Sequence, residues 1–310
     1  MNHVVLIITD SHDITTDLLV EHIGSNHIFR FNADRLDDYI FCLDTKGIFI
    51  DNGFRKVTDS NIVKVYWRKP FMTRSSSEES LQGYVQRETN YILLDLFQYF
   101  HLQHKTVLVK PDSLVRYKKM NFLNLAQQYF RIPQWSLLWG NIMPAKEFMD
   151  TEGNIIVKSL SSAKVTSDRI MLTTQVEVNL LSEMYPWFTQ ELIEASHDLT
   201  VVYINGKTFA YIADRGLLEH VDVRKAIGNP DFKWMPYTLP TSSITSIRNL
   251  MHKADLKFGR LDFLICQDTI VFLEVNPNGQ WAWLDTDGSN GLLNAIIEEI
   301  APWSSTYSLV

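Results

Sequence analysis

The chain of 310 residues carries 29 basic and 36 acidic side chains, which leaves a formal net charge of −7 at pH 7. That surplus of negative charge argues against a general nucleic-acid or anionic-membrane binder, so any anionic ligand must be held by a local basic cluster. The length indicates two domains or one large multilayer fold, and hydrophobic residues, at 45%, are abundant enough to fill a core.

The first hundred residues alternate short apolar runs with polar segments, which is typical of an α/β layer structure. We expect strands over residues 4–9, 28–31, 48–50 and 62–67, with a hairpin turn at 44–47. A polar loop over 74–79 leads into a helix over about 79–103, and a short strand follows over 106–109. Pro111 forces an extended link after that strand, so we place a domain boundary there.

The remaining two thirds of the chain predict a second set of alternating elements. We expect helices over 114–130, 175–185, about 246–257 and about 291–300. We expect strands over 135–139, 154–160 and 187–193, two more around a turn at 205–207, and a hairpin from 260 to 276.

The predicted hairpin carries its polar residues only near the far ends of two apolar strands. A three-residue turn at 267–269 would place Asp262 opposite Glu274 and Arg260 opposite Asn276, with all four side chains on one face. Opposed carboxylates repel unless a cation or Arg260 compensates, and oxygen ligands of this kind suit Mg²⁺. An even-numbered turn would put the two acids on opposite faces. The alternative is that one acid pairs with Arg260 while the rest face solvent.

Two further groups precede this hairpin. Lys158 ends an apolar strand, and the small polar run 159–167 after it is a candidate loop over phosphates. A lysine at a strand end is, taken alone, more often an ordinary surface residue. The segment 188–203 begins as an apolar strand and becomes a polar connection, which can present backbone donors and acceptors to a purine edge, with acids left for a ribose.

In this order, the three groups resemble the ATP-grasp superfamily of ATP-dependent carboxylate ligases over about residues 112–300. The runs 65–70, 222–224 and 272–281 resemble the microviridin-type peptide macrocyclases, which install side-chain ester or amide links in graspetide precursors. The resemblance implies an α/β (α+β) ATP-grasp fold: an N-terminal pre-ATP-grasp α/β domain over 1–111, a central grasp subdomain over 112–187, and a C-terminal grasp subdomain with the metal site over 188–310, both subdomains being built on antiparallel sheets.

The resemblance also implies roles for particular residues. ATP would be held at its phosphates by Lys118 and Lys158, at its adenine by the hinge residues Gln190, Glu191 and Leu192, and at its ribose by Asp198. Mg²⁺ would be held by Asp262, Glu274 and Asn276. A cation near the transferred phosphoryl group or the acceptor carboxylate would come from Arg224, with Arg215 and Arg260 as further candidates.

The activity implied is that of an ADP-forming ligase. It would phosphorylate Asp or Glu side chains of a ribosomal precursor peptide, made of a leader and an acidic core, and join them to Thr or Ser hydroxyls or Lys amines. An acidic enzyme needs a local positive surface for such a peptide, and we expect it on the first domain, from Arg68, Lys69, Arg74, Lys105 and Lys110.

Two other functions stay open at this point: an ATP-grasp carboxylate–amine ligase for an amino acid, a small molecule or a protein tail, and a nucleotide-binding module without catalysis. The lack of a GxGxxG or GxxxxGK[ST] motif argues against a dinucleotide-dependent dehydrogenase and a P-loop kinase. With two distant cysteines and no apolar run long enough to cross a bilayer, we expect a cytoplasmic protein without nucleic-acid or membrane partners. Formation of a homodimer is left open.

Overall fold

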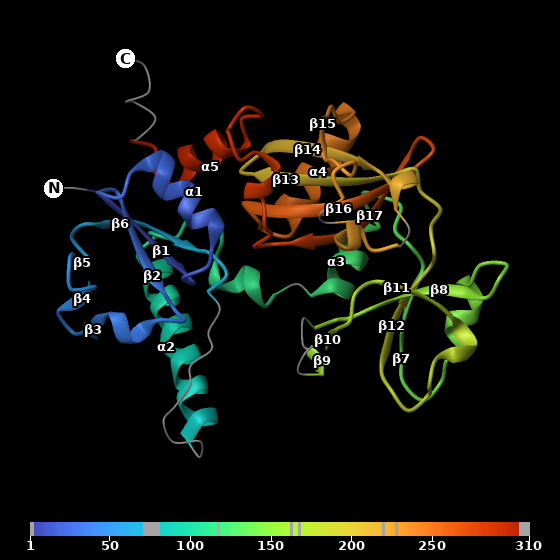
Figure 1. Ribbon diagram of the computed structural model, residues 1–310, viewed down its shortest axis with the longest axis horizontal. Helices are drawn as coiled ribbons and strands as arrows, with labels where there is room; N and C mark the ends of the chain where they lie inside the picture. The colour runs from blue at the N-terminus through green and yellow to red at the C-terminus, as the bar shows by residue number, and fades with distance from the viewer. Residues whose placement is uncertain are drawn as a thin grey trace.

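The computed structural model describes residues 3–70, 81–116, 118–161, 164–166, 169–218, 221–226 and 229–303 (Figure 1). Its amino-terminal part is built on a three-stranded parallel sheet of β1 (Val4–Thr9), β2 (Ile28–Asn32) and β6 (Ile62–Trp67), in the order β2-β1-β6. Every residue of β1 is buried, because a central parallel strand is covered on both faces. The helices α1 (Ile14–Ile23) and α2 (Gln82–Leu102) contribute to the same core.

A small antiparallel sheet extends this part and confirms the hairpin expected near residue 45. It consists of β3 (Ile40–Asp44), β4 (Gly47–Asp51) and β5 (Lys56–Thr58). The strand expected over 106–109 is wrong: Thr106 makes only a single parallel bridge to Val65. The loop expected over 74–79 lies outside the described residues.

The central part is a four-stranded antiparallel sheet in the order β11-β8-β12-β7. Its strands are β7 (Trp135–Leu138), β8 (Asn154–Lys158), β11 (Thr174–Glu177) and β12 (Trp187–Gln190), with α3 (Lys119–Ala126) before them and the short hairpin β9 (Lys164–Thr166) and β10 (Arg169–Ile170) between them. The helix expected over 175–185 is wrong. Residues 174–177 pair with β8 instead, and Val176 packs on the core while Gln175 and Glu177 alternate outwards.

The carboxy-terminal part is a five-stranded antiparallel sheet in the order β15-β14-β13-β16-β17. Its strands are β13 (His197–Ile204), β14 (Lys207–Asp214), β15 (Met235–Tyr237), β16 (Phe258–Cys266) and β17 (Thr269–Asn276). The helix α4 (Thr241–Lys253) packs on it through Ile247, Leu250 and Met251, and begins directly after Pro240, earlier than expected.

The β16–β17 hairpin differs from its expected form in one respect that matters for the site. The turn has two residues, Gln267 and Asp268, because Cys266 pairs with Thr269. The expected three-residue turn is therefore wrong. The register shifts further along, however, where Phe263 pairs with Phe272 and Asp262 with Glu274. Leu273 is the extra residue of a β-bulge, so the expected pairs Asp262–Glu274 and Arg260–Asn276 are confirmed.

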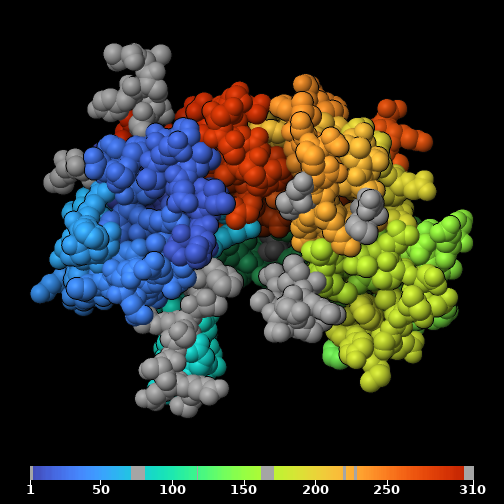
Figure 2. Space-filling model, viewed as in Figure 1, coloured from blue at the N-terminus to red at the C-terminus, as the bar shows by residue number. Residues whose placement is uncertain are grey.

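The two ends of the chain share one core. The helix α5 (Leu292–Ile300) buries Leu292 and Ile296 in the same hydrophobic cluster as β1 and α2. Figures 1 and 2 accordingly show the red carboxy-terminal segments between the blue amino-terminal part and the orange five-stranded sheet, with the central part below that sheet. We propose that the central part runs to Gln190 rather than to residue 187, because β12 pairs with β7 and β8. No helix among the described residues is both long and apolar enough to span a membrane.

Candidate active site

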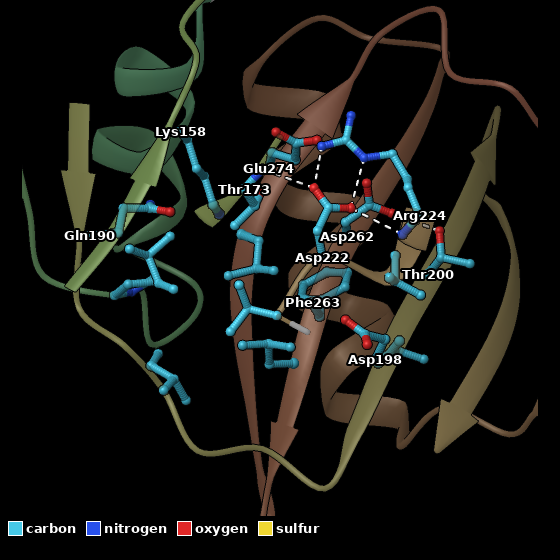
Figure 3. Close-up of a pocket in the computed structure, with 18 of the residues that line it drawn as sticks. Lys158, Thr173, Gln190, Asp198, Thr200, Asp222, Arg224, Asp262, Phe263 and Glu274 are labelled. Carbon is cyan, nitrogen blue, oxygen red and sulfur yellow. Dashed lines mark hydrogen bonds and ion pairs between the residues drawn. The ribbon is translucent and has the colours of Figure 1, made fainter. Parts of the chain in front are cut away.

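A cavity of about 870 Å³ lies where the central sheet meets the five-stranded sheet (Figure 3). Lys158 and Gln190, at the ends of β8 and β12, come from one side, and Asp262 and Glu274, on β16 and β17, come from the other. The two sheets therefore place basic and amide groups opposite carboxylates across one space.

The acidic end of the cavity is a compact hydrogen-bonded group. Asp262 accepts hydrogen bonds from the Thr200 hydroxyl at 2.8 Å and from Arg260 Nη2 at 2.9 Å. The Asn276 amide nitrogen donates to Glu274 Oε1 at 3.1 Å and to Asp262 Oδ2 at 3.4 Å. The bulge at Leu273 makes this arrangement possible, since it returns Glu274 to the face that Asp262 occupies.

Two lysines oppose Glu274. Lys119 Nζ lies 3.0 Å from Glu274 Oε2, and Lys158 reaches the same carboxylate from β8 without a direct ion pair among the contacts described. Burial would raise the pKa of Glu274, but the two ammonium groups outweigh it and lower that pKa to about 2. Burial lowers the pKa of Lys158 to about 8, although Glu274 opposes the shift.

These residues fit a hard divalent cation. Within the described residues no group of three or more His, Cys, Asp or Glu side chains is placed to hold a metal. Two carboxylates and one amide leave coordination positions for water and phosphate oxygens, which is how Mg²⁺ is usually bound. The Asn276 amide now turns its nitrogen toward both acids and would have to present its oxygen instead.

Gln190 is the most distinctive group at the other end of the cavity. Its side chain is 1% exposed, and neither its amide nitrogen nor its amide oxygen has a hydrogen-bond partner among the described residues. Burying an unpaired amide is costly, so this group is suited to a ligand that both donates and accepts, such as the edge of a purine. Leu192 and Ile193 line the cavity beside it.

The Glu191 side chain makes hydrogen bonds within the fold, unlike that of Gln190. Its carboxylate accepts hydrogen bonds from Arg131 Nη2 at 3.3 Å and from the Gln134 backbone at 3.1 Å. The Glu191 backbone N–H in turn donates to the Gln134 carbonyl at 2.9 Å. These bonds tie the connection after β12 to the segment before β7, which fixes the wall formed by residues 191–193.

Two residues predicted to contact different groups instead contact one another. Arg215 Nη1 donates to Asp198 Oδ2 at 2.7 Å, and Arg215 Nη2 donates to the Val221 carbonyl at 3.2 Å. Burial raises the pKa of Asp198 to about 6, although Arg215 acts in the opposite direction. Both line the cavity, so a sugar hydroxyl would meet this pair rather than an isolated carboxylate.

Asp222 joins the two sheets and was not predicted as a site residue. Its carboxylate is nearly buried and accepts hydrogen bonds from the backbone N–H and guanidinium of Arg224. It also accepts a bond from the Thr173 N–H, just before β11, at 2.8 Å. Arg224 itself is 55% exposed at its side chain, so Asp222 holds a cation that a ligand in the cavity can reach.

The structure gathers most of the predicted site residues in this cavity but separates one of them. Lys118 is exposed, donates to the Leu114 carbonyl at 3.2 Å and does not line the cavity, whereas Lys119 does. The lysine of α3 that faces the predicted metal ligands is therefore Lys119. Thr200 was also missed, although its position opposite Asp262 on the neighbouring strand follows once the order of β13 and β16 is known.

Of the residues expected to form a basic docking surface on the amino-terminal part, Lys69 is exposed, whereas three others make contacts within the fold. Arg68 is fully buried, Lys105 lies 3.4 Å from Asp59, and Lys110 lies 2.6 Å from Asp255. Each of these three cations therefore lies beside an acidic side chain of the protein itself. Arg74 lies outside the described residues.

An amino-terminal α/β part followed by two antiparallel sheets that enclose a cavity between them defines the ATP-grasp fold, so the expected fold class is confirmed. Macrocyclase MdnC from Microcystis aeruginosa MRC, bound with precursor peptide MdnA, superposes with a TM-score of 0.81 at 22% identity over 96% of this chain and 99% of that one. The RiPP-associated ATP-grasp ligase of Chryseobacterium gregarium, in complex with ADP and a leader and core peptide, gives 0.84 at 22% identity over 97% of each chain.

The ATP-grasp ligase PsnB, complexed with minimal precursor, Mg and ADP, gives a TM-score of 0.72 at 16% identity over 96% of this chain and 98% of that one. No protein-family model and no curated protein matches the sequence. At these identities the likeness establishes the fold, and it extends over nearly the whole length of both chains.

Proposed function

We propose that this protein is an ATP-dependent peptide macrocyclase. It phosphorylates Asp or Glu side chains of a ribosomal precursor peptide and joins them to Thr or Ser hydroxyls, or to Lys amines, of the same peptide. The observation that carries the proposal is the facing pair Asp262 and Glu274 with Lys119 and Lys158 opposite them, in a fold shared end to end with ligases described with precursor peptides.

The first step would be phosphorylation of a side-chain carboxylate. A carboxylate oxygen attacks the γ-phosphorus of ATP, the bond to the β–γ bridging oxygen breaks, and ADP leaves. Lys119, Lys158 and Arg224 line the cavity where negative charge would move, and cations held in position there stabilise such charge. Mg²⁺, held by Asp262, Glu274 and Asn276, would neutralise phosphate oxygens and orient them.

The second step would be capture of the acyl phosphate. A hydroxyl or amine attacks the acyl carbon, the carbon–oxygen bond to phosphate breaks, and the nucleophile loses its proton as the ester or amide forms. Inorganic phosphate is released. Water must be excluded because it would hydrolyse the intermediate, so bound nucleotide and peptide would themselves have to fill the open cavity between the two sheets.

The same cavity offers room for a peptide beside the nucleotide. Phe232, Trp234 and Trp283 stack edge to face, with ring centroids 6.2 and 5.7 Å apart, and all three line the cavity together with Arg224 and Arg260. An aromatic wall next to two guanidinium groups suits a peptide that presents a carboxylate among apolar residues. Such a reaction draws on the ATP of the cytoplasm, where Cys42 and Cys266 would stay reduced thiols.

The proposal is tested by ADP release and product mass with a leader-bearing acidic peptide. We expect ADP release to rise only with that peptide, and the product to lose one water for each link formed. A peptide with Gln and Asn in place of its core Glu and Asp is the matched control and should give no rise. Turnover with free amino acids but not with the peptide would favour the carboxylate–amine ligase instead, and nucleotide binding without turnover would favour a non-catalytic module.

A further inference from the structure

Arg68, the residue directly after β6, is an arginine with no exposed surface. Its Nε lies 3.8 Å from Asp13 Oδ2, its Nη2 donates to the Thr15 hydroxyl at 3.1 Å, and the same nitrogen donates to the side-chain oxygen of Gln280. Burying a guanidinium is expensive, and its Nε and Nη1 have no hydrogen-bond partner in the described part of the chain. An apolar side chain would be the cheaper choice for a purely structural contact.

Gln280 connects Arg68 to the other side of the molecule. Its side-chain oxygen also accepts from Thr15 at 3.2 Å, so two groups of the amino-terminal part bind one amide. Its backbone carbonyl accepts from Arg260 Nη1 at 3.3 Å. Gly279 permits this approach, because a Cβ there would lie 2.5 Å from the Cβ of Arg260.

Arg260 completes the path to the metal ligands. Its Nη2 donates to Asp262 at 2.9 Å, and its guanidinium is held between that carboxylate and the Gln280 carbonyl. The Arg260 side chain is 22% exposed and lines the cavity. A continuous series of polar contacts thus runs from the amino-terminal sheet to the acidic end of the cavity.

We propose that Arg68 and Gln280 are positioning residues, through which the amino-terminal part fixes Arg260 against Asp262. This inference rests on the proposed function, which assigns the cavity to ATP and Mg²⁺. It concerns Mg²⁺-dependent nucleotide binding, which can be measured without a peptide. Without the side-chain amide of Gln280, segment 279–280 loses its anchor on Arg68, and the backbone carbonyl that accepts from Arg260 is no longer held in place. A displacement of the Arg260 guanidinium by about 1 Å would weaken its interaction with the charge that develops in the transition state.

The test uses the full-length chain with Gln280→Met, which removes the amide at similar volume. Because Gln280→Met leaves the buried Arg68 guanidinium with one acceptor fewer, the thermal unfolding midpoint should fall by a few degrees, and binding is measured well below it. We expect about a tenfold rise in the Mg²⁺ concentration needed for half-maximal ADP binding by calorimetry, and a similar fall in kcat for ADP release. Binding of ADP in EDTA should stay the same, because the base-binding end is untouched. Gln280→Glu, which keeps the acceptor, should restore most of the loss.

Tyr66→Phe is the matched control, since it removes another hydrogen bond across the same junction, from Trp281 Nε1 to Tyr66 at 3.4 Å. It should behave like the unmodified protein. In an Arg260→Lys background, Gln280→Met should add little, because the residue through which it acts is already changed. Full additivity of these two substitutions, or an equal effect of Tyr66→Phe, would overturn the proposal. If the unmodified protein binds ADP in a Mg²⁺-dependent way but does not turn over the peptide, that result would count against the macrocyclase function alone.

Discussion

Asp262 lies directly opposite Glu274 because Leu273, the residue before that glutamate, bulges out of β17. The two-residue turn at Gln267–Asp268 would otherwise pair Asp262 with Leu273 and turn Glu274 to the opposite face of the sheet. The bulge therefore decides whether the acidic end of the cavity exists. β-bulges are frequent beside active sites, where they redirect a single side chain.

The role of Glu274 is tested by Glu274→Gln together with an exchange of neighbours, Leu273→Glu with Glu274→Leu. Each should lower peptide-dependent ADP release by at least about 100-fold, because the carboxylate proposed to bind Mg²⁺ is lost or moved off its face of the sheet. Circular dichroism should confirm that both variants fold. Leu273 also lines the cavity, so retained activity in the exchange variant would mean that a carboxylate at residue 273 can replace Glu274 and that the bulge does not select the metal ligand.

The adjacent lysines of α3 form a natural matched pair. Lys119→Ala should weaken Mg²⁺–ADP binding by about tenfold or more, since it removes the ammonium 3.0 Å from Glu274. Lys118→Ala should leave it unchanged, because the Lys118 side chain is exposed and bonded to Leu114. Fluorescence or calorimetric titration of both variants measures this, and the reverse ranking would reinstate Lys118 as the phosphate-binding lysine.

Replacement of Gln190 should weaken ATP binding without lowering the free energy of unfolding. Gln190→Leu removes a buried amide that has no hydrogen-bond partner among the described residues, so the free energy of unfolding should stay constant or rise by about 1 kcal/mol. ATP affinity should fall by about tenfold, and preference for ATP over GTP should narrow, if the amide reads the purine edge. Denaturant unfolding and nucleotide titrations give the two quantities. A large loss of stability would show that the amide is paired within the fold.

Asp198 predicts a pH dependence of stability. Its pKa of about 6 lies above the ordinary value of 3.8, so the folded state holds this proton more tightly than the unfolded state does. The resulting stabilisation is complete below about pH 4 and disappears as the pH rises through about 6, a change on the order of 3 kcal/mol.

Asp198→Asn removes this titration. Between pH 4 and 7 the unmodified protein should therefore lose unfolding free energy relative to the variant. Urea unfolding of both proteins at several pH values measures this difference. Parallel curves over that range would show that Asp198 has an ordinary pKa and that Arg215 compensates its burial fully.

Trp283 tests the aromatic wall. Its side chain is 44% exposed at the cavity, so Trp283→Ala should raise the KM for the peptide while leaving ADP affinity unchanged. Trp139 is 78% exposed and does not line the cavity, which makes Trp139→Ala the matched control. Equal effects of the two substitutions on the KM for the peptide would exclude a specific contact at Trp283.

The sequence by itself determined which chemistry the chain can carry. The carboxylates and amide at the ends of an apolar hairpin, the lysine ending β8 and the polar connection after β12 are local patterns, and period-two alternation places such residues without knowledge of the rest of the fold. The strands β1 and β6, the hairpin at residue 45 and the α2 helix were predictable for the same reason.

Tertiary structure alone decided the remaining points. The two-residue turn and the bulge shift the strand register in opposite senses and cancel at Asp262. The sequence therefore predicted the pairing of Asp262 with Glu274, but neither the turn length nor the bulge. The choice of Lys119 over Lys118 depends on how α3 is rotated against β17. The burial of Arg68, which converted an expected docking cation into a link to Gln280, depends on contacts between residues more than two hundred positions apart. Such long-range packing leaves no periodic trace in the sequence, because each partner looks locally like an ordinary polar residue.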